Sequence, residues 1–175
     1  MRAALPIVIA VMVAAPAWAM GSGTANSAIA SATLRDGQGA EKGDVRLVNT
    51  RGGMELRITA RGLTPGEHGA HLHMVGSCTG PDFTSAGSHL NPDGKKHGAR
   101  NPLGSHLGDL PNLVAASNGS GTLTVPLTDT AEELAAQLFN ADGTALVIHA
   151  GPDDYMTDPT GNSGGRILCG VLTRS

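Results

Sequence analysis

Aromatic residues are almost absent from this sequence: of 175 residues, one is Trp, one is Tyr and two are Phe. Glycine (25 residues) and proline (10 residues) are instead abundant, which is typical of short β-strands separated by turns. Basic segments are also missing, since the longest is Lys95-Lys96, and the formal net charge is -3. Without basic residues interleaved with aromatic ones, the chain is not expected to bind nucleic acid.

Long hydrophobic runs are missing except at the N-terminus, where Met1 and Arg2 precede an apolar run over residues 3–15. This run is shorter than the roughly 20 apolar residues that a membrane helix needs. The segment Ala17-Trp18-Ala19 that follows has the small-x-small form of a signal-peptidase site. We therefore predict a signal peptide over residues 1–19, a flexible lead over 20–27 and one domain over 28–175. The mature protein is expected to be secreted, with the periplasm as the expected compartment, and to leave the membrane after cleavage.

Cysteine is scarce as well, with Cys78 and Cys169 as the two residues of this type. They are far apart and do not form a Cys-x-x-Cys motif, so a redox or zinc pair is not indicated. In an exported protein this arrangement favours a disulfide, and two free buried thiols are the alternative. A bridge that closes so long a loop would stabilise the fold by roughly 4 to 5 kcal/mol on the chain-entropy model.

Eight short segments have the composition and alternation of strands, with turn signals between them. They cover residues 28–34, 45–49, 54–60, 69–73, 113–117, 122–127, 144–149 and 166–172. The pattern Thr130-x-x-Glu133 is a capping box and predicts a brief helix. Two long irregular segments, 74–110 and 150–165, are of a length that is usually functional. The sequence thus predicts an all-β fold, an antiparallel sandwich or barrel with two long functional loops.

Histidines mark both a strand and a loop. Because side chains alternate along a strand, His71 and His73 share one face and Leu72 takes the other. His68 lies off that face, and we assign it to a structural hydrogen bond. In the first long loop the spacings of 8, 9 and 3 residues join His89, His97, His106 and Asp109. Three imidazoles and a carboxylate can converge tetrahedrally on zinc.

These residues belong to a set of motifs that resembles the copper/zinc superoxide dismutases, in their secreted bacterial form. The motifs are His71-Leu-His73, Ser85-Ala-Gly-Ser-His89-x-Asn-Pro, Lys96-His97-Gly98, His106-x-Gly-Asp109-Leu-x-Asn112, Val147-x-His149 and Gly161-Asn-x-Gly-x-Arg166-x-x-Cys169-Gly170. They follow one another in the family's order across essentially the whole mature chain. The resemblance implies the family's eight-stranded Greek-key barrel.

The resemblance also implies two metal sites, one for a copper ion and one for a zinc ion. The copper ligands would be His71, His73, His89 and His149, and the zinc ligands His89, His97, His106 and Asp109. His89 would then bridge the two metals as an imidazolate. Asp153 would join a copper histidine to a zinc histidine, and Arg166 would hold a small anion beside the copper. The family's disulfide would pair Cys78 with Cys169.

The activity that the resemblance implies is disproportionation of superoxide to dioxygen and hydrogen peroxide, with superoxide as the small-molecule substrate. Arg166 and His89 would take part directly. Two other functions are considered. A zinc hydrolase needs an open zinc position, which Asp109 fills, and a general-base Glu, which the ligand motifs lack. A non-catalytic copper- and zinc-binding module on the same fold is the second alternative. The chain could be a monomer or a homodimer.

Overall fold

The computed structural model describes residues 28–175, so the predicted signal peptide and flexible lead lie outside the described part of the chain. The strands form one antiparallel sheet in the order β4-β6-β7-β3-β2-β1-β9-β8-β5, and β10 pairs with β1. The elements are β1 (Ala28–Asp36), β2 (Glu41–Thr50), β3 (Gly53–Ala60), β4 (Gly66–His68), β5 (Ala70–His73), the 3-10 helix η1 (Thr84–Ala86), β6 (Leu113–Ala115), β7 (Gly121–Leu127), the helix α1 (Ala131–Leu138), β8 (Ala145–His149), β9 (Arg166–Val171) and β10 (Thr173–Arg174). None of the helices in this range is long and apolar enough to cross a bilayer.

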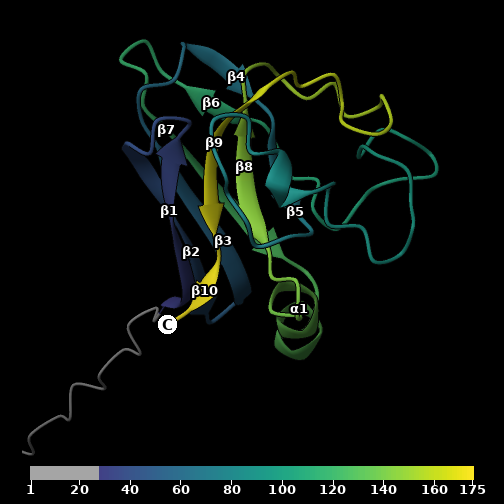
Figure 1. Ribbon diagram of the computed structural model, residues 1–175. Coiled ribbons are helices and arrows are strands. Elements are labelled where there is room, and N and C mark those ends of the chain that lie inside the picture. Colours follow the sequence, from purple (N-terminus) through teal and green to yellow (C-terminus); the bar gives the residue numbers. More distant parts are fainter. Residues whose placement is uncertain (1–27) are drawn as a thin grey trace, which may run out of the picture.

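The sheet wraps into a nearly closed barrel because β4 and β5, which end the strand order, follow one another in the chain. Strand β4 pairs with β6 and β5 pairs with β8, so the backbone changes partners at the intervening Gly69. Figure 1 shows the barrel with the long loops extending from the side of β5, while α1 lies at the lower end of the view, away from them. Closure removes most of the unpaired strand edges that an open sheet would expose. The predicted all-β antiparallel fold is confirmed.

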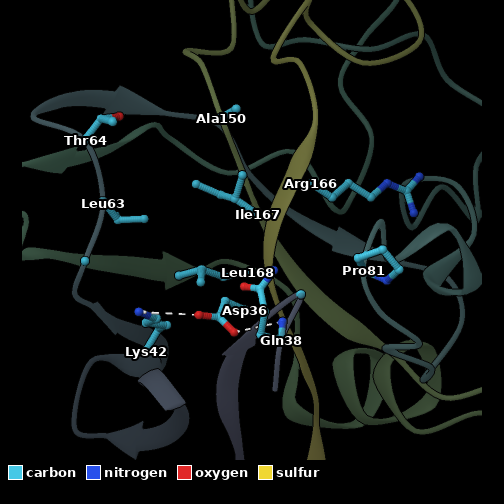
Figure 2. A pocket seen from close by; sticks show the side chains of 12 residues that line it. Asp36, Gln38, Lys42, Leu63, Thr64, Pro81, Ala150, Arg166, Ile167 and Leu168 are labelled. Atoms are coloured by element: carbon cyan, nitrogen blue, oxygen red, sulfur yellow. Dashed lines mark hydrogen bonds and ion pairs between the residues drawn. The ribbon is translucent and has the colours of Figure 1, made fainter. Parts of the chain in front are cut away.

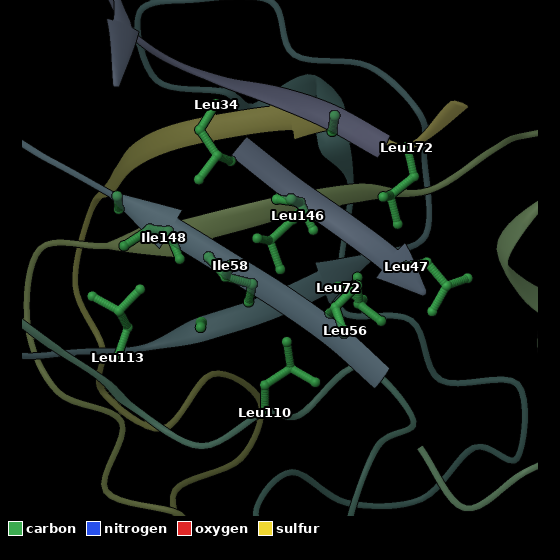
Figure 3. Close-up of a cluster of buried hydrophobic side chains, with 14 of the residues drawn as sticks. Leu34, Leu47, Leu56, Ile58, Leu72, Leu110, Leu113, Leu146, Ile148 and Leu172 are labelled. Atoms are coloured by element: carbon green, nitrogen blue, oxygen red, sulfur yellow. The ribbon is translucent and has the colours of Figure 1, made fainter. Parts of the chain in front are cut away.

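The barrel interior holds the alternating apolar residues of the strands (Figure 3). Val45 faces Ile58 and Leu47 faces Leu56 across β2 and β3, and all four side chains are buried. Burying such a side chain contributes roughly 1.5 to 3 kcal/mol relative to leaving it exposed. Leu72 of β5 belongs to this interior, and its neighbours His71 and His73 point to the opposite face of the strand. The separation of faces predicted for this strand is confirmed.

Each of the eight predicted strand segments contains a strand, and the structure adds the short β4 and β10. Strand β2 starts at Glu41, earlier than predicted, because the polar segment before Val45 pairs with β1 and β3 on both sides. Hydrogen bonding to strands on both sides outweighs the low strand preference of these residues.

The predicted capping box is present at the start of α1, where Thr130 and Glu133 cap each other. Leu134 and Leu138 of this helix are buried in the barrel interior.

Candidate metal centre

The first long loop returns alongside β5 and adds its own side chains to the histidine face of that strand. Leu72 N donates to Gly108 O (2.9 Å), and Leu72 O accepts from Leu90 N (2.8 Å). A Cβ at Gly108 would lie 2.3 Å from Leu72 O, so only glycine allows this approach. The same backbone path places Asp109 opposite His71 and His89 opposite His73. Residues far apart in sequence are thereby brought to one place.

Four histidines form the first group of metal donors. His71, His73, His89 and His149 are all buried, and their donor atoms lie within 4.8 Å of one another. One ring nitrogen of each has no hydrogen-bond partner: Nδ1 of His71 and Nε2 of His73, His89 and His149. Buried polar atoms in proteins are nearly always paired, so four converging unpaired nitrogens indicate a missing ligand.

The partner of the other ring nitrogen sets the tautomer in three of these histidines. Nε2 of His71 donates to Asp153 Oδ2 (2.7 Å), Nδ1 of His73 to Gly87 O (2.9 Å) and Nδ1 of His149 to Gly164 O (3.0 Å). Because carboxylate and carbonyl oxygens only accept, these nitrogens carry the proton in a neutral ring. The unpartnered nitrogens then present free lone pairs, as metal ligands require.

The second group of donors surrounds one carboxylate oxygen. Oδ1 of Asp109 lies 3.0 Å from His89 Nδ1, 2.9 Å from His97 Nδ1 and 3.2 Å from His106 Nδ1. A tetrahedral zinc with bonds of about 2.0 to 2.1 Å has ligand separations of about 3.3 Å. The other oxygen, Oδ2, accepts from the backbone N–H of Gly98 and of His106, which orients the carboxylate. The predicted zinc residues therefore fit a tetrahedral cation.

A set of donors within 4.8 Å of one another is also formed by His71, His89, His97 and Asp109. This set differs from the predicted zinc residues by containing His71 in place of His106. The unpartnered nitrogen of His71, however, belongs to the first group, and its Nε2 is engaged by Asp153. Nδ1 of His106 lies 3.4 Å from His89 Nδ1 and has no competing carbonyl, so the second group fits a cation better with His106.

Asp153 joins the two groups, as the resemblance implied. Its Oδ2 accepts from His71 Nε2 (2.7 Å), and its Oδ1 lies 3.0 Å from His97 Nε2. Asn112 holds Asp153 in turn, because Asn112 Oδ1 accepts from Asp153 N (2.9 Å) and Asn112 Nδ2 donates to Asp153 O (3.0 Å). The sequence motif contained Asn112 without indicating this role, which depends on a contact across 41 residues.

The ionisation of the two groups differs. Burial, together with neighbouring positive groups, lowers the pKa of His73 to about 2, of His149 to about 3 and of His89 to about 4. These rings are neutral at pH 7, so His73 and His149 can bind a metal through the free nitrogen without losing a proton, whereas a bridging His89 would still have to lose one. Burial opposes a charge on His97 too, but its hydrogen bonds to Asp109 and Asp153 raise its pKa to about 9. Those bonds hold the pKa of both carboxylates well below the ordinary value.

Arg166, the predicted anion-binding residue, begins β9. Its guanidinium donates to Phe83 O (2.7 Å) and to Gly87 O (2.8 Å), and its charge contributes to the low pKa of His73 and His149. A groove of about 430 Å³ is lined by the first residues of β9, Arg166 to Leu168, and by the Asp36–Lys42 ion pair. Figure 2 shows the Arg166 guanidinium pointing away from that ion pair. The guanidinium of Arg166 is therefore directed away from the ion pair and toward the carbonyls of Phe83 and Gly87.

The predicted disulfide is present between Cys78 and Cys169, whose Cα atoms are 5.7 Å apart. Cys169 of β9 packs with Phe83, Ala86 and Val147 in a small buried cluster. The bridge thus secures the part of the first loop whose carbonyls hold Arg166. His68 makes the predicted structural contacts, with Nδ1 donating to His149 O (2.7 Å) and Nε2 lying 2.9 Å from Thr64 O.

Comparison with known proteins agrees with this geometry. The family model for copper/zinc superoxide dismutase matches residues 41–172. "Superoxide dismutase [Cu-Zn] 2" of Aquifex aeolicus is 44% identical over 146 residues, which cover 82% of this chain and 85% of that protein. The crystal structure of a superoxide dismutase-like protein from Bacillus subtilis has a TM-score of 0.75 and 39% identity, covering 82% of this chain and 97% of that chain. The copper/zinc superoxide dismutase of Brucella abortus has a TM-score of 0.64 and 31% identity, covering 81% and 97%.

Proposed function

This chain belongs to the copper/zinc superoxide dismutase family, and we propose that it disproportionates superoxide to dioxygen and hydrogen peroxide outside the cytoplasm. The family's cofactors are copper and zinc. The observation that carries the proposal is the convergence of four buried histidine nitrogens without hydrogen-bond partners. His71, His73, His89 and His149 would hold copper, and His89, His97, His106 and Asp109 would hold zinc.

Copper held by these four histidines would supply the alternating one-electron oxidation and reduction that the reaction needs. His89 would carry one of the two protons that the product needs: Nε2, which has no hydrogen-bond partner, would take up a proton and deliver it to the peroxide formed, and water would supply the second proton. Its Nδ1 stays beside Asp109 Oδ1 at 3.0 Å, so the ring keeps its place while the proton moves. Arg166 binds the anion electrostatically, and its bonds to two backbone carbonyls keep the guanidinium in position.

The zinc residues have a positioning role. Oδ1 of Asp109 lies within 3.2 Å of the Nδ1 atoms of three histidines. Asp153 is hydrogen-bonded to both His97 and His71 and so connects the two groups. Zinc bound by these residues would supply no redox chemistry and would act as a template that keeps His89 oriented. The disulfide and the bacterial relatives support a location outside the cytoplasm, and we extend this to the periplasm with cleavage after Ala19.

The test is superoxide consumption by purified protein of measured copper and zinc content. Activity is expected to rise in proportion to copper and to disappear when copper alone is removed. A protein that binds one copper per chain and consumes no superoxide would instead be the non-catalytic metal-binding module, a possibility raised by the superoxide dismutase-like name of the Bacillus subtilis relative. Activity without copper would contradict the proposal outright.

A further inference from the structure

The second long loop touches the zinc group at a place separate from Asp153. Oδ1 of Asp158 accepts a hydrogen bond from the backbone N–H of His97 at 2.8 Å. Its Oδ2 lies 3.0 Å from Lys96 Nζ, so one carboxylate binds two consecutive residues of the first loop. Asp158 and His97 are 61 residues apart, and the contact exists only because the two loops lie against each other.

His97 is otherwise held through its ring. The ring nitrogens face Asp109 and Asp153, and these contacts orient the imidazole plane. Asp158 accepts a hydrogen bond from the backbone N–H of the same residue. This contact therefore restrains the backbone of His97, to which the ring is attached. The next residue, Gly98, packs so tightly against the second loop that a Cβ there would lie 2.1 Å from Tyr155 O. Arg100 N also donates to Tyr155 O (2.9 Å), which secures the loop on the far side of His97.

We propose that Asp158 is a positioning residue for the zinc site, which holds the backbone of His97 and thereby slows the loss of zinc. This inference rests on the proposed zinc role of His97. The contact that matters is the one to the backbone N–H, because Lys96 is largely exposed and its ion pair with Asp158 is screened by water and salt. A charge-assisted hydrogen bond of this kind corresponds to about tenfold in an equilibrium constant.

The experiment compares zinc release from three variants of the metal-loaded protein, with a chromogenic chelator as the zinc acceptor. Asp158→Ala removes both contacts and is expected to release zinc about ten times faster than wild type. Lys96→Ala removes the ion pair and leaves the bond to His97 N, so its release rate is expected to equal that of wild type. Asp158→Asn retains an acceptor oxygen and is expected to recover most of the loss.

Cobalt substituted for zinc supplies a readout that a general loss of stability does not produce. The visible spectrum of the cobalt protein is expected to shift in Asp158→Ala and to be unchanged in Lys96→Ala, with equal midpoints for thermal unfolding of the two metal-free variants. The inference would be overturned if Asp158→Ala released zinc at the wild-type rate. It would also be overturned if Lys96→Ala released zinc as fast as Asp158→Ala. Failure of the underlying zinc assignment looks different: wild type and His97→Ala would then bind the same amount of zinc.

Discussion

Arg166 and His73 donate hydrogen bonds to the same acceptor, the carbonyl oxygen of Gly87, at 2.8 and 2.9 Å. One nitrogen of the guanidinium and the proton-bearing nitrogen of a proposed copper ligand are therefore fixed relative to each other by a single backbone atom. The carbonyl lies in the loop segment that the Cys78–Cys169 bridge ties to β9. The distance between Arg166, the proposed anion-binding residue, and the proposed copper site is thus set by the first loop together with β9.

Replacement of Arg166 tests this arrangement. Arg166→Ala is expected to lower the second-order rate with superoxide roughly ten- to a hundredfold, because a charge-assisted contact to the anion is lost. Arg166→Lys keeps the charge but cannot bind both carbonyls in the same way, so it is expected to recover only part of the rate. The measurement is the rate at matched copper content. A rate in Arg166→Ala equal to that of wild type would contradict the assignment.

Charge steering by the loops is expected to be weak. The second loop contains Asp153, Asp154 and Asp158 but neither Lys nor Arg. In the first loop Lys95 pairs with Asp93 (3.1 Å) and Lys96 pairs with Asp158 (3.0 Å), which offsets their charges. Charges beyond about 8 Å act little at physiological salt.

We therefore predict a shallow dependence of the rate on ionic strength. The rate is to be measured across a salt series, with Arg166→Ala as the control that lacks the cation nearest the site. A steep decrease of the wild-type rate with salt would show that other positive charges steer the anion.

Metal contents distinguish the histidines. His89→Ala is expected to lower both copper and zinc, because its two nitrogens face the two groups of donors. His73→Ala is expected to lower copper alone, since its Nδ1 is bonded to Gly87 O and its Nε2 is the unpartnered nitrogen of the first group, so neither ring nitrogen is bonded to Asp109. Elemental analysis of the purified variants checks both. Normal zinc in His89→Ala would argue against a shared imidazole.

Loss of the disulfide is expected to weaken the fold and the metal site together. Cys78→Ser removes a bridge that spans 91 residues, which on the chain-entropy model contributes roughly 4 to 5 kcal/mol. It also releases the loop segment that carries Phe83 O and Gly87 O, so metal content is expected to fall. Urea unfolding and metal analysis measure the two effects. Two alkylatable thiols in the secreted wild-type protein would show that the bridge does not form in the cell.

The metal-free protein is expected to lose stability as the pH falls from 7 to 5. His73 and His149 have folded-state pKa values of about 2 and about 3, below the ordinary value of 6.5. Between pH 7 and pH 5 the unfolded chain therefore binds protons at these histidines and the folded chain does not. Each contributes a loss of roughly 2 kcal/mol at pH 5 relative to neutral pH. His97 acts in the opposite sense, because its pKa of about 9 is above 6.5, but most of its contribution is already present at pH 7.

Urea unfolding at pH 7 and at pH 5 measures this loss of free energy of unfolding. The loss is expected to be smaller in His73→Gln, because one of the two histidines is absent. With metals bound the lone pairs are occupied, and acid must then displace the metals first. An equal free energy of unfolding at pH 7 and pH 5 for the metal-free wild type would contradict the linkage.

Much of the site could be predicted because it is local in sequence. The alternation of His71, Leu72 and His73 needs only strand geometry, and the structure places Leu72 inside the barrel and the histidines on the opposite face. The capping box at Thr130 is equally local. The two cysteines and the predicted signal peptide indicated a disulfide without reference to the fold. Residue chemistry and spacing suffice to predict a contact when the two partners are close in sequence, or when their residue type, such as cysteine, identifies them.

The tertiary structure alone decided which backbone atoms complete the centre. Every residue has a carbonyl, so no sequence signal distinguishes Gly87 O, which accepts from His73 and Arg166, or Gly164 O, which accepts from His149. The bond from His97 N to Asp158 likewise joins two loops whose packing depends on how the barrel closes. The sequence by itself determined which side chains can bind metal. The folded backbone determined their tautomers, their orientation and the direction of Arg166, because hydrogen bonds to carbonyls depend on position in space and not on residue type.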